Sequence, residues 1–257
     1  MDLIDVHCHL DDPSFERDLE EVIQKAKSNG VKVFVLSAML DLGLTRAIKI
    51  ASDHACVELS VGAQPQSINE NNWKAVLENM EEALKTGKFI AVGEVGLDRG
   101  RGGGDLTFQE KFFREAIRLA ESKKLPLVVH SRGAGREAIR VLLDEKLNVN
   151  VDMHAYDGRV STAKEASEKD GIFFSIPPSV ARSDQKIRLV KALPLTSILL
   201  ESDAPALAPE PGERNTPSNL IVSVSSIAKI KNLTQESVAS TTSKNAQRFF
   251  GKSWGLE

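Results

Sequence analysis

Short apolar, β-branched runs alternate with amphipathic stretches of helical period along the whole chain, and this alternation limits the fold more than any other feature. The candidate strands are residues 3–8, 31–38, 57–62, 89–94, 125–130, 149–154, 171–176 and 197–203. The candidate helices are residues 16–28, 42–53, 72–85, 108–122, 135–145, 161–168, 184–192 and 235–249. Parallel strands need crossover helices, and strands that are apolar throughout need cover on both faces. The pattern therefore predicts an α/β protein with a parallel sheet.

Eight strands, each followed by a helix, close most naturally into a (β/α)₈ TIM barrel. An open, doubly wound sheet is the competing arrangement. No change of composition marks a boundary within the 257 residues, so we expect a single domain over residues 1–257. Thr234 is a suitable N-cap for the last candidate helix, and Glu236 lies in the favourable first turn.

Composition indicates the cellular compartment of the protein and the kinds of partner that it can bind. Hydrophobic content of 41% and charged content of 27% are typical of globular proteins, and no apolar run is long enough to span a bilayer. No signal-peptide pattern opens the chain, and two cysteines, Cys8 and Cys56, do not suggest a disulfide framework. We therefore expect a cytoplasmic protein without membrane association or an obligate protein partner. The net charge of -3 argues against broad electrostatic coating of nucleic acid, so any polyanion binds locally.

His7 and His9 end the first candidate strand, and alternate residues of a strand point to the same side. Cys8 faces the other way and is interpreted as a core residue. An isolated His-x-His pair is a weak signal, because two hydrogen-bonded core histidines fit it as well. In a barrel, however, chemical side chains gather at the carboxyl ends of the strands. Other candidate strands end on further residues of this kind: Glu94, His130, His154 and Asp203.

Four imidazoles and two carboxylates at one barrel mouth exceed the needs of one tetrahedral site, so two divalent ions are the economical interpretation. A carboxylate such as Glu94 can bridge ions ~3.5–4 Å apart, a spacing at which paired metals activate water. Each residue alone also fits a plainer role, as a packed histidine or a capping aspartate. Histidines favour Zn or Mn, whereas carboxylates and phosphate chemistry tolerate Mg, so the identity of the metal stays open.

Five segments resemble the signature segments of the TatD-type metal-dependent deoxyribonucleases, within the amidohydrolase-like barrels. They are His7-x-His9, Gly93-Glu94-Val95-Gly96-Leu97-Asp98, His130-Ser131-Arg132, His154-Ala155-Tyr156-Asp157-Gly158 and Glu201-Ser202-Asp203-Ala204-Pro205. Residues 173–179, Gln185-Lys186, residues 193–197 and Arg214-Asn215-x-Pro217 are particularly similar to the third human TatD-domain-containing type. The resemblance covers nearly the whole chain. It implies divalent-metal-dependent hydrolysis of phosphodiester bonds in DNA, with trimming from an end.

The resemblance also implies roles for individual residues. One ion would be held by His7, His9, Glu94 and Asp203, and the other by Glu94, His130 and His154. Glu94 would be the bridge, at the place where many amidohydrolases have a carboxylated lysine. Asp203 would then be placed to take the proton of the attacking water as a general base.

One position departs from the family pattern. The family usually reads Gly-x-His-Pro after the third strand, whereas this chain reads Gly62-Ala63-Gln64-Pro65. Glutamine can donate a hydrogen bond but cannot carry a proton or a positive charge near neutral pH. With Gln64 at this catalytic position, we expect slower cleavage or a different substrate.

Three residues beside the candidate ligands are candidates for contact with the substrate or the ligands. Arg132 fits either a fork onto a phosphate or a salt bridge at the barrel rim. Tyr156, the only tyrosine, fits either stacking on a base or packing under the following loop. Glu201 shares a face with Asp203, and we expect it to orient a ligand or to pair with Arg132.

Two loops carry further arginines. Arg99 and Arg101 lie in the glycine-rich loop at residues 98–104, which fits either a phosphate-gripping lid or a mobile solvated loop. In the same loop Asp98 is expected to orient the site and not to bind metal. Residues 209–217 are expected to wall the mouth, with Arg214 a weaker phosphate candidate.

Three functions follow from these features. The leading hypothesis is a metal-dependent phosphodiesterase that acts on single-stranded DNA or strand ends. The second is hydrolysis of an ester such as a D-aminoacyl group on tRNA, with the same metals. The third is a nucleic-acid-binding barrel that has lost turnover, for which Gln64 is the only hint.

Overall fold

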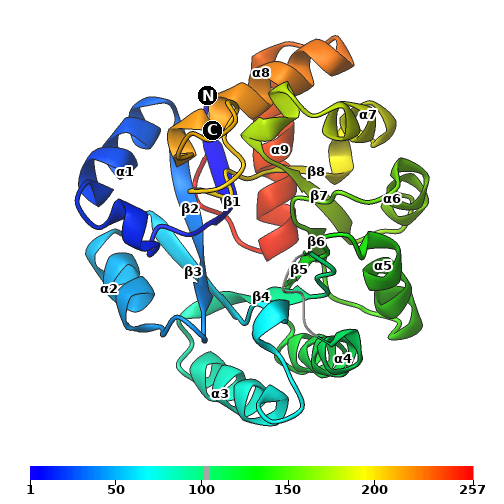
Figure 1. Ribbon diagram of the computed structural model, residues 1–257. Helices are drawn as coiled ribbons and strands as arrows, with labels where there is room; N and C mark the ends of the chain where they lie inside the picture. The colour runs from blue at the N-terminus through cyan, green and yellow to red at the C-terminus, as the bar shows by residue number, and fades with distance from the viewer. Residues whose placement is uncertain (101–104, 257) are drawn as a thin grey trace.

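Eight parallel strands in the order β1 to β8 form a nearly closed barrel inside a ring of helices (Figure 1). The computed structural model describes residues 1–100 and 105–256. The strands are β1 (Leu3–Cys8), β2 (Val31–Met39), β3 (Val57–Gly62), β4 (Phe89–Gly96), β5 (Leu127–His130), β6 (Val151–Met153), β7 (Ile172–Ile176) and β8 (Ile198–Leu200). The helices are α1 (Leu19–Ser28), α2 (Thr45–Asp53), α3 (Trp73–Lys85), α4 (Leu106–Lys123), α5 (Gly135–Asp144), α6 (Val160–Ser167), α7 (Asp184–Ala192), α8 (Leu220–Lys231) and α9 (Gln235–Phe250). The expected (β/α)₈ barrel is confirmed, and the open doubly wound sheet is wrong.

The segment that follows the last strand bonds to the carboxyl end of the first strand. The backbone N–H of Asp203 donates to the carbonyl of His7 at 2.9 Å, and the N–H of His9 donates to the carbonyl of Ala204 at 2.8 Å. These bonds join the two ends of the barrel at its carboxyl rim. Barrel closure therefore brings candidate ligands from opposite ends of the sequence side by side.

The barrel has two apolar layers. Side chains inside the barrel form one layer with α9: Ile4, Val6, Val33, Val35, Ala91, Val128, Phe173, Leu199, Ala246, Phe249 and Phe250. A larger layer lies between the strands and the surrounding helices. In Figure 1, α9 lies inside the ring of the other helices. Its Phe249 and Phe250 side chains belong to the apolar layer inside the barrel. The interior is thus a packed core, and the carboxyl end is left for chemistry.

The element boundaries differ from expectation where the site is built. The fifth and sixth strands begin two residues later than expected, and the eighth ends at Leu200, three residues before Asp203, where the chain leaves regular pairing. Helix α8 was missed, so β8 is followed by two helices. Its signal was present, since Leu220, Val224, Ile227 and Ala228 are buried at helical spacing among β-branched residues typical of strands.

Two expectations about local structure are confirmed, the N-cap of α9 and the core position of Cys8. The side chain of Thr234 accepts from the N–H of Ser237 at 3.1 Å and caps α9. Cys8 and Cys56 are free thiols, and Cys8 is buried in the strand–helix layer. Within the residues that the structure describes, no helix has both the length and the apolar character needed to cross a bilayer.

Candidate metal centre

The carboxyl ends of five strands bring six candidate ligands into one cluster. They are His7, His9, Glu94, His130, His154 and Asp203. Ligand atoms lie within 4.8 Å of one another in each of three overlapping groups: His7, His9 and Glu94; His7, His154 and Asp203; and Glu94, His130 and His154. The cluster lies at the mouth of a cavity of about 420 Å³ that opens at this end of the barrel.

Glu94 lies at the centre of the cluster. Its Oε2 atom is 3.1 Å from Nε2 of His154, 3.3 Å from Nε2 of His7 and 3.8 Å from Nδ1 of His130. Only 5% of Glu94 is exposed. One buried carboxylate oxygen therefore faces imidazoles from three different strands.

The local backbone explains how Glu94 reaches this position. Pairing between β4 and β5 is irregular between Val92 and Val95, and such irregularities commonly redirect a side chain beside an active site. Gly93 has φ +132°, and a Cβ atom there would lie 2.4 Å from the carbonyl oxygen of Val128. Glycine is therefore required directly before Glu94, because no other residue lets the strands approach so closely.

His7, His9 and Asp203 form the other side of the cluster. The Nε2 atoms of His7 and His9 are 3.2 Å apart and lie 3.7 and 3.6 Å from Oδ1 of Asp203. Asp203 has φ +52°, a left-handed conformation that is uncommon for a residue with a side chain. The closure bonds hold Asp203 in this conformation, and strained residues of this kind cluster at functional sites.

Buried carboxylates fix the orientation of two imidazoles. Asp98 lies 2.8 Å from Nε2 of His130, and Glu201 lies 3.1 Å from Nδ1 of His154. Glu201 also accepts from the N–H of Ala155 and the hydroxyl of Ser175, both at 2.8 Å. Glu201 therefore orients His154, and the alternative pairing with Arg132 is wrong. Asp98 orients His130 as expected.

The same bonds show that the cluster fits a cation. A ring nitrogen bonded to a carboxylate carries the proton, so the other nitrogen of a neutral imidazole is a bare acceptor. Nε2 of His154 and Nδ1 of His130 are the nitrogens that would face a cation, and they lie 3.4 Å apart beside the Glu94 carboxylate. Acceptors that face one another repel unless protons or cations lie between them. Imidazole nitrogen and carboxylate oxygen are ligands of Zn and Mn, so the donor set fits divalent ions.

The pKa values follow from this crowding. Burial alone would raise the pKa of Glu94, but hydrogen bonds from His130, His154 and His7 hold that pKa well below its usual range. Burial opposes protonation of His9, yet Asp203 and Glu94 raise the pKa of His9 to about 9. Protons therefore occupy the place that cations would take. Because metal ligands must lose protons, we expect metal affinity to fall as the pH is lowered.

Two of the other expected site residues line the mouth. Gln64 lies at the end of β3, and Arg132 follows β5. Within residues 1–100 and 105–256, no carboxylate lies within ion-pair distance of Arg132, so the rim salt bridge is not found. Arg132 is therefore the expected phosphate contact that the structure leaves available.

The remaining expected contacts are not at the mouth. Tyr156 is 1% exposed and packs edge-on against Phe174, so it cannot stack on a base, and the packing interpretation holds.

Arg99 is 3.2 Å from Glu137 and lines a different groove. Arg214 binds the carboxylate of Asp18 and lies over the ring of Phe15, so its guanidinium is already engaged. The phosphate contacts expected of Arg99 and Arg214 are therefore not supported. Arg101 lies outside the described residues.

The structure also places residues at the mouth that were not expected there, among them a lysine and an exposed leucine. Lys186 of α7 and Leu42 of the loop after β2 both line the cavity. Lys186 is 6% exposed, whereas Leu42 is 65% exposed. A lysine in an amphipathic helix predicts a solvated side chain, so its burial had no local signal in the sequence.

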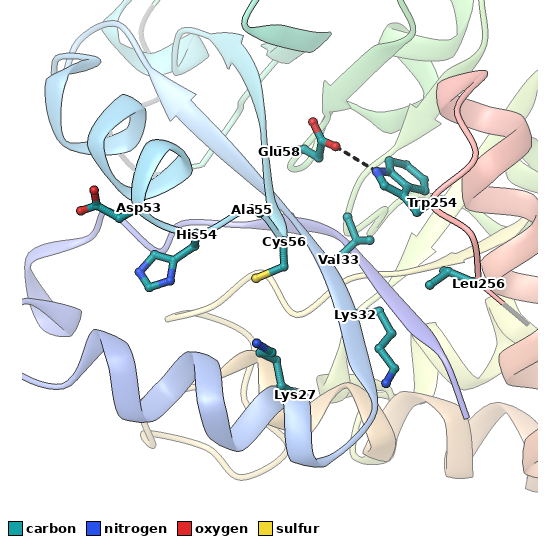
Figure 2. A pocket seen from close by; sticks show the side chains of 10 residues that line it. All are labelled: Lys27, Lys32, Val33, Asp53, His54, Ala55, Cys56, Glu58, Trp254 and Leu256. Atoms are coloured by element: carbon teal, nitrogen blue, oxygen red, sulfur yellow. Dashed lines mark hydrogen bonds between the residues drawn. The ribbon is translucent and has the colours of Figure 1, made fainter.

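A second cavity of about 570 Å³ lies at the amino-terminal end of β2 and β3, away from the cluster. Figure 2 shows Trp254 at its edge, with Nε1 donating to Glu58 at 2.9 Å. Lys32 and His54 also line this cavity. Lys32 lies within 4 Å of Asp2, and His54 lies within 4 Å of Glu20. None of the candidate metal groups in the described residues includes a residue of this cavity, so we place the chemistry at the carboxyl end.

Comparisons with known proteins match the whole length of the barrel. The sequence profile of the family described as TatD related DNase matches residues 4–251. The human deoxyribonuclease TATDN3 is 40% identical, and the alignment covers 97% of this chain and 95% of the human protein. An uncharacterized metal-dependent hydrolase, MJ1582 of Methanocaldococcus jannaschii, is 32% identical over 96% of both chains. The similarity to the third human type is thereby confirmed.

Solved structures give the same result. The crystal structure of YJJV, a TatD homologue from Escherichia coli, has a TM-score of 0.88 and 26% identity over 98% of both chains. A TatD-family hydrolase from Entamoeba histolytica has a TM-score of 0.87 at 19% identity, covering 97% of this chain and 98% of its own. The second comparison supports the fold alone.

The Glu201→Gln variant tests the support of His154. The amide cannot accept from His154, Ala155 and Ser175 together, so we expect metal affinity to fall about 10- to 100-fold. Calorimetric titration of the metal-free protein with Zn measures the change. Glu58→Gln, at the opposite end of the barrel, is the control and should bind as the wild type does. If the Glu201→Gln variant binds Zn as tightly as the wild type does, this carboxylate does not support the metal site.

Proposed function

Because this chain belongs to the TatD related DNase family, we propose that it cleaves phosphodiester bonds of DNA from a strand end, using two divalent ions. The chain is a TatD-type metal-dependent hydrolase. The observation that carries the proposal is the Oε2 atom of Glu94, which faces ring nitrogens of three histidines. The printed name of human TATDN3, deoxyribonuclease, supports the choice of DNA.

The six clustered residues divide into two ligand sets that share Glu94. In this proposal one ion is held by His7, His9, Glu94 and Asp203, and the other by Glu94, His130 and His154; the three overlapping groups of close ligand atoms support it. Bound divalent ions would lower the pKa of water and offset the charge that grows on the phosphate. Nitrogen and oxygen donors of both sets fit Zn or Mn, and the carboxylates also tolerate Mg.

The side chains of the mouth have distinct tasks. Although burial opposes ionisation, His9 and the other histidines keep the pKa of Asp203 below its usual value, so this carboxylate is ionised at neutral pH. Asp203 takes the proton of the water that attacks phosphorus. Arg132 forks onto two phosphate oxygens. Gln64 donates its amide hydrogens to the substrate but supplies no proton to the leaving oxygen.

The shape of the site supports action at an end. The metal ligands lie at one mouth, and the lining residues come from loops around the barrel axis. A single mouth of this kind accepts the end of a strand more readily than a duplex that continues in both directions. Single-stranded DNA and strand ends are therefore the proposed substrates.

The Glu94→Gln variant tests this function. Replacing the shared carboxylate removes a ligand from both sets, so we expect loss of bound metal and more than a hundredfold loss of cleavage, beyond the ~10- to 100-fold effect of supporting residues. Elemental analysis measures the metal, and end-labelled single-stranded DNA measures cleavage with added Mg, Mn or Zn. Retained metal and cleavage in this variant would overturn the bridging role.

The wild-type protein in the same assay separates the alternatives. Hydrolysis of D-aminoacyl-tRNA without cleavage of DNA would replace the proposal with the deacylase. Tight binding of DNA without cleavage, with all three metals, would replace it with the binding barrel.

The Gln64→His variant tests the departure from the family pattern. Protonated histidine can give a proton to the leaving oxygen, and such assistance is worth about 10² to 10⁴ in rate. We expect at least a tenfold higher kcat on single-stranded DNA, with the larger gain below the ordinary histidine pKa of about 6.5. Gln66→His, at the same mouth, is the matched control. An unchanged or lower rate would show that Gln64 does not limit cleavage.

A further inference from the structure

Lys186 is a buried cation at the mouth that the proposed chemistry does not use. It lies in the first turn of α7, where the side chain of Ser183 caps the helix by accepting from its backbone N–H. Only 6% of Lys186 is exposed, and its Nζ atom donates to the carbonyl of Ala155 at 3.0 Å. The same residue lines the cavity that contains the candidate ligands. Its ammonium group is therefore held beside the turn that follows His154.

The ammonium group is incompletely satisfied. It has three donors, and the carbonyl of Ala155 is its one hydrogen-bond acceptor among the described residues. No carboxylate in residues 1–100 and 105–256 forms an ion pair with it. The three acids whose charges act on it have other partners: Glu201 binds His154, Asp157 accepts from the N–H of Gly133, and Asp203 lies 3.6 Å from Nε2 of His9. Burial lowers the pKa of Lys186, and an anion in the cavity would offset this cost.

A purely structural role is already filled by the neighbouring residue. The side-chain amide of Gln185 donates to the carbonyl of Gly158 at 2.9 Å and links α7 to the segment after β6. A second link through Lys186 would require a buried charge where an amide suffices. Attachment of α7 to its neighbour therefore does not explain why a charged lysine lies at the cavity wall.

We propose that Lys186 binds a phosphate oxygen of the substrate in the mouth, and this rests on the proposed phosphodiesterase function. In strand order, Lys186 follows β7 and Arg132 follows β5, so the turn after β6 that carries His154 lies between the two cations. A phosphate beside His154 can be held from both sides. The two cations favour a substrate whose cleaved bond is a phosphodiester. A substrate whose cleaved bond is a neutral ester has no anion for them to bind.

Binding of inorganic phosphate to the metal-loaded protein tests this site. For Lys186→Met we expect a Kd about tenfold higher than for the wild type, because a charged hydrogen bond is lost. Lys186→Arg should keep the Kd within a few fold. Lys191→Met, an exposed lysine of the same helix, is the control and should leave the Kd unchanged. Wild-type phosphate affinity in Lys186→Met, with equal metal content, would overturn the proposal.

Steady-state kinetics on single-stranded DNA provide a second, independent test of the role of Lys186. We expect Lys186→Met to raise KM about tenfold with a smaller change in kcat, whereas a structural defect would lower kcat and thermal stability together. If that variant does not fold, Lys186→Gln replaces it in both measurements. If the wild type fails to cleave DNA, the proposed function fails, but the phosphate titration still decides whether Lys186 binds the anion. A lower kcat with unchanged phosphate affinity would show that Lys186 has a structural role and does not bind the anion.

Discussion

The structure depends on one electrostatic constraint, the approach of imidazole nitrogens from three strands to one buried carboxylate. Nδ1 of His130 and Nε2 of His154 face each other at 3.4 Å, beside Oε2 of Glu94. Asp98 and Glu201 bind the far nitrogens of these imidazoles and fix the orientation of both rings, so the facing nitrogens stay directed at Glu94. Only protons or cations make such a cluster stable, and divalent ions satisfy all of its donors at once.

The barrel supplies the rigidity that this crowding requires. Bonds between the segments after β1 and β8 fix His7, His9 and Asp203 relative to one another. Gly93 lets β4 approach β5 at Glu94, and the left-handed backbone of Asp203 is held from both sides. At the other end, α9 fills the interior with aromatic side chains. The strained positions that build the site, Gly93 and Asp203, thus lie at the carboxyl rim, while apolar packing stabilises the barrel interior.

Much of this arrangement could be predicted from the sequence, because strand ends in a parallel barrel meet at one rim. The alternation of elements predicted the fold, and the residue types at the ends of strands predicted which side chains the rim collects. Helix α8 was missed because its β-branched residues are typical of strands, although its buried positions had helical spacing.

Contacts between distant segments could not be predicted. Arg214 binds Asp18, 196 residues away, and nothing near either residue indicates the pair. Tyr156 is enclosed by Gly135 and Gly158, which leave room for its ring only in the folded barrel. Burial of Lys186 likewise depends on how α7 packs beside the mouth.

Anomalous diffraction from crystals grown with Mn is the most direct measurement of the metal centre. Two anomalous peaks on either side of the Glu94 carboxylate, one beside His7, His9 and Asp203 and the other beside His130 and His154, are the expected result. A single peak not in contact with Glu94, or none within reach of these six side chains, would contradict the shared carboxylate and with it the two-ion site.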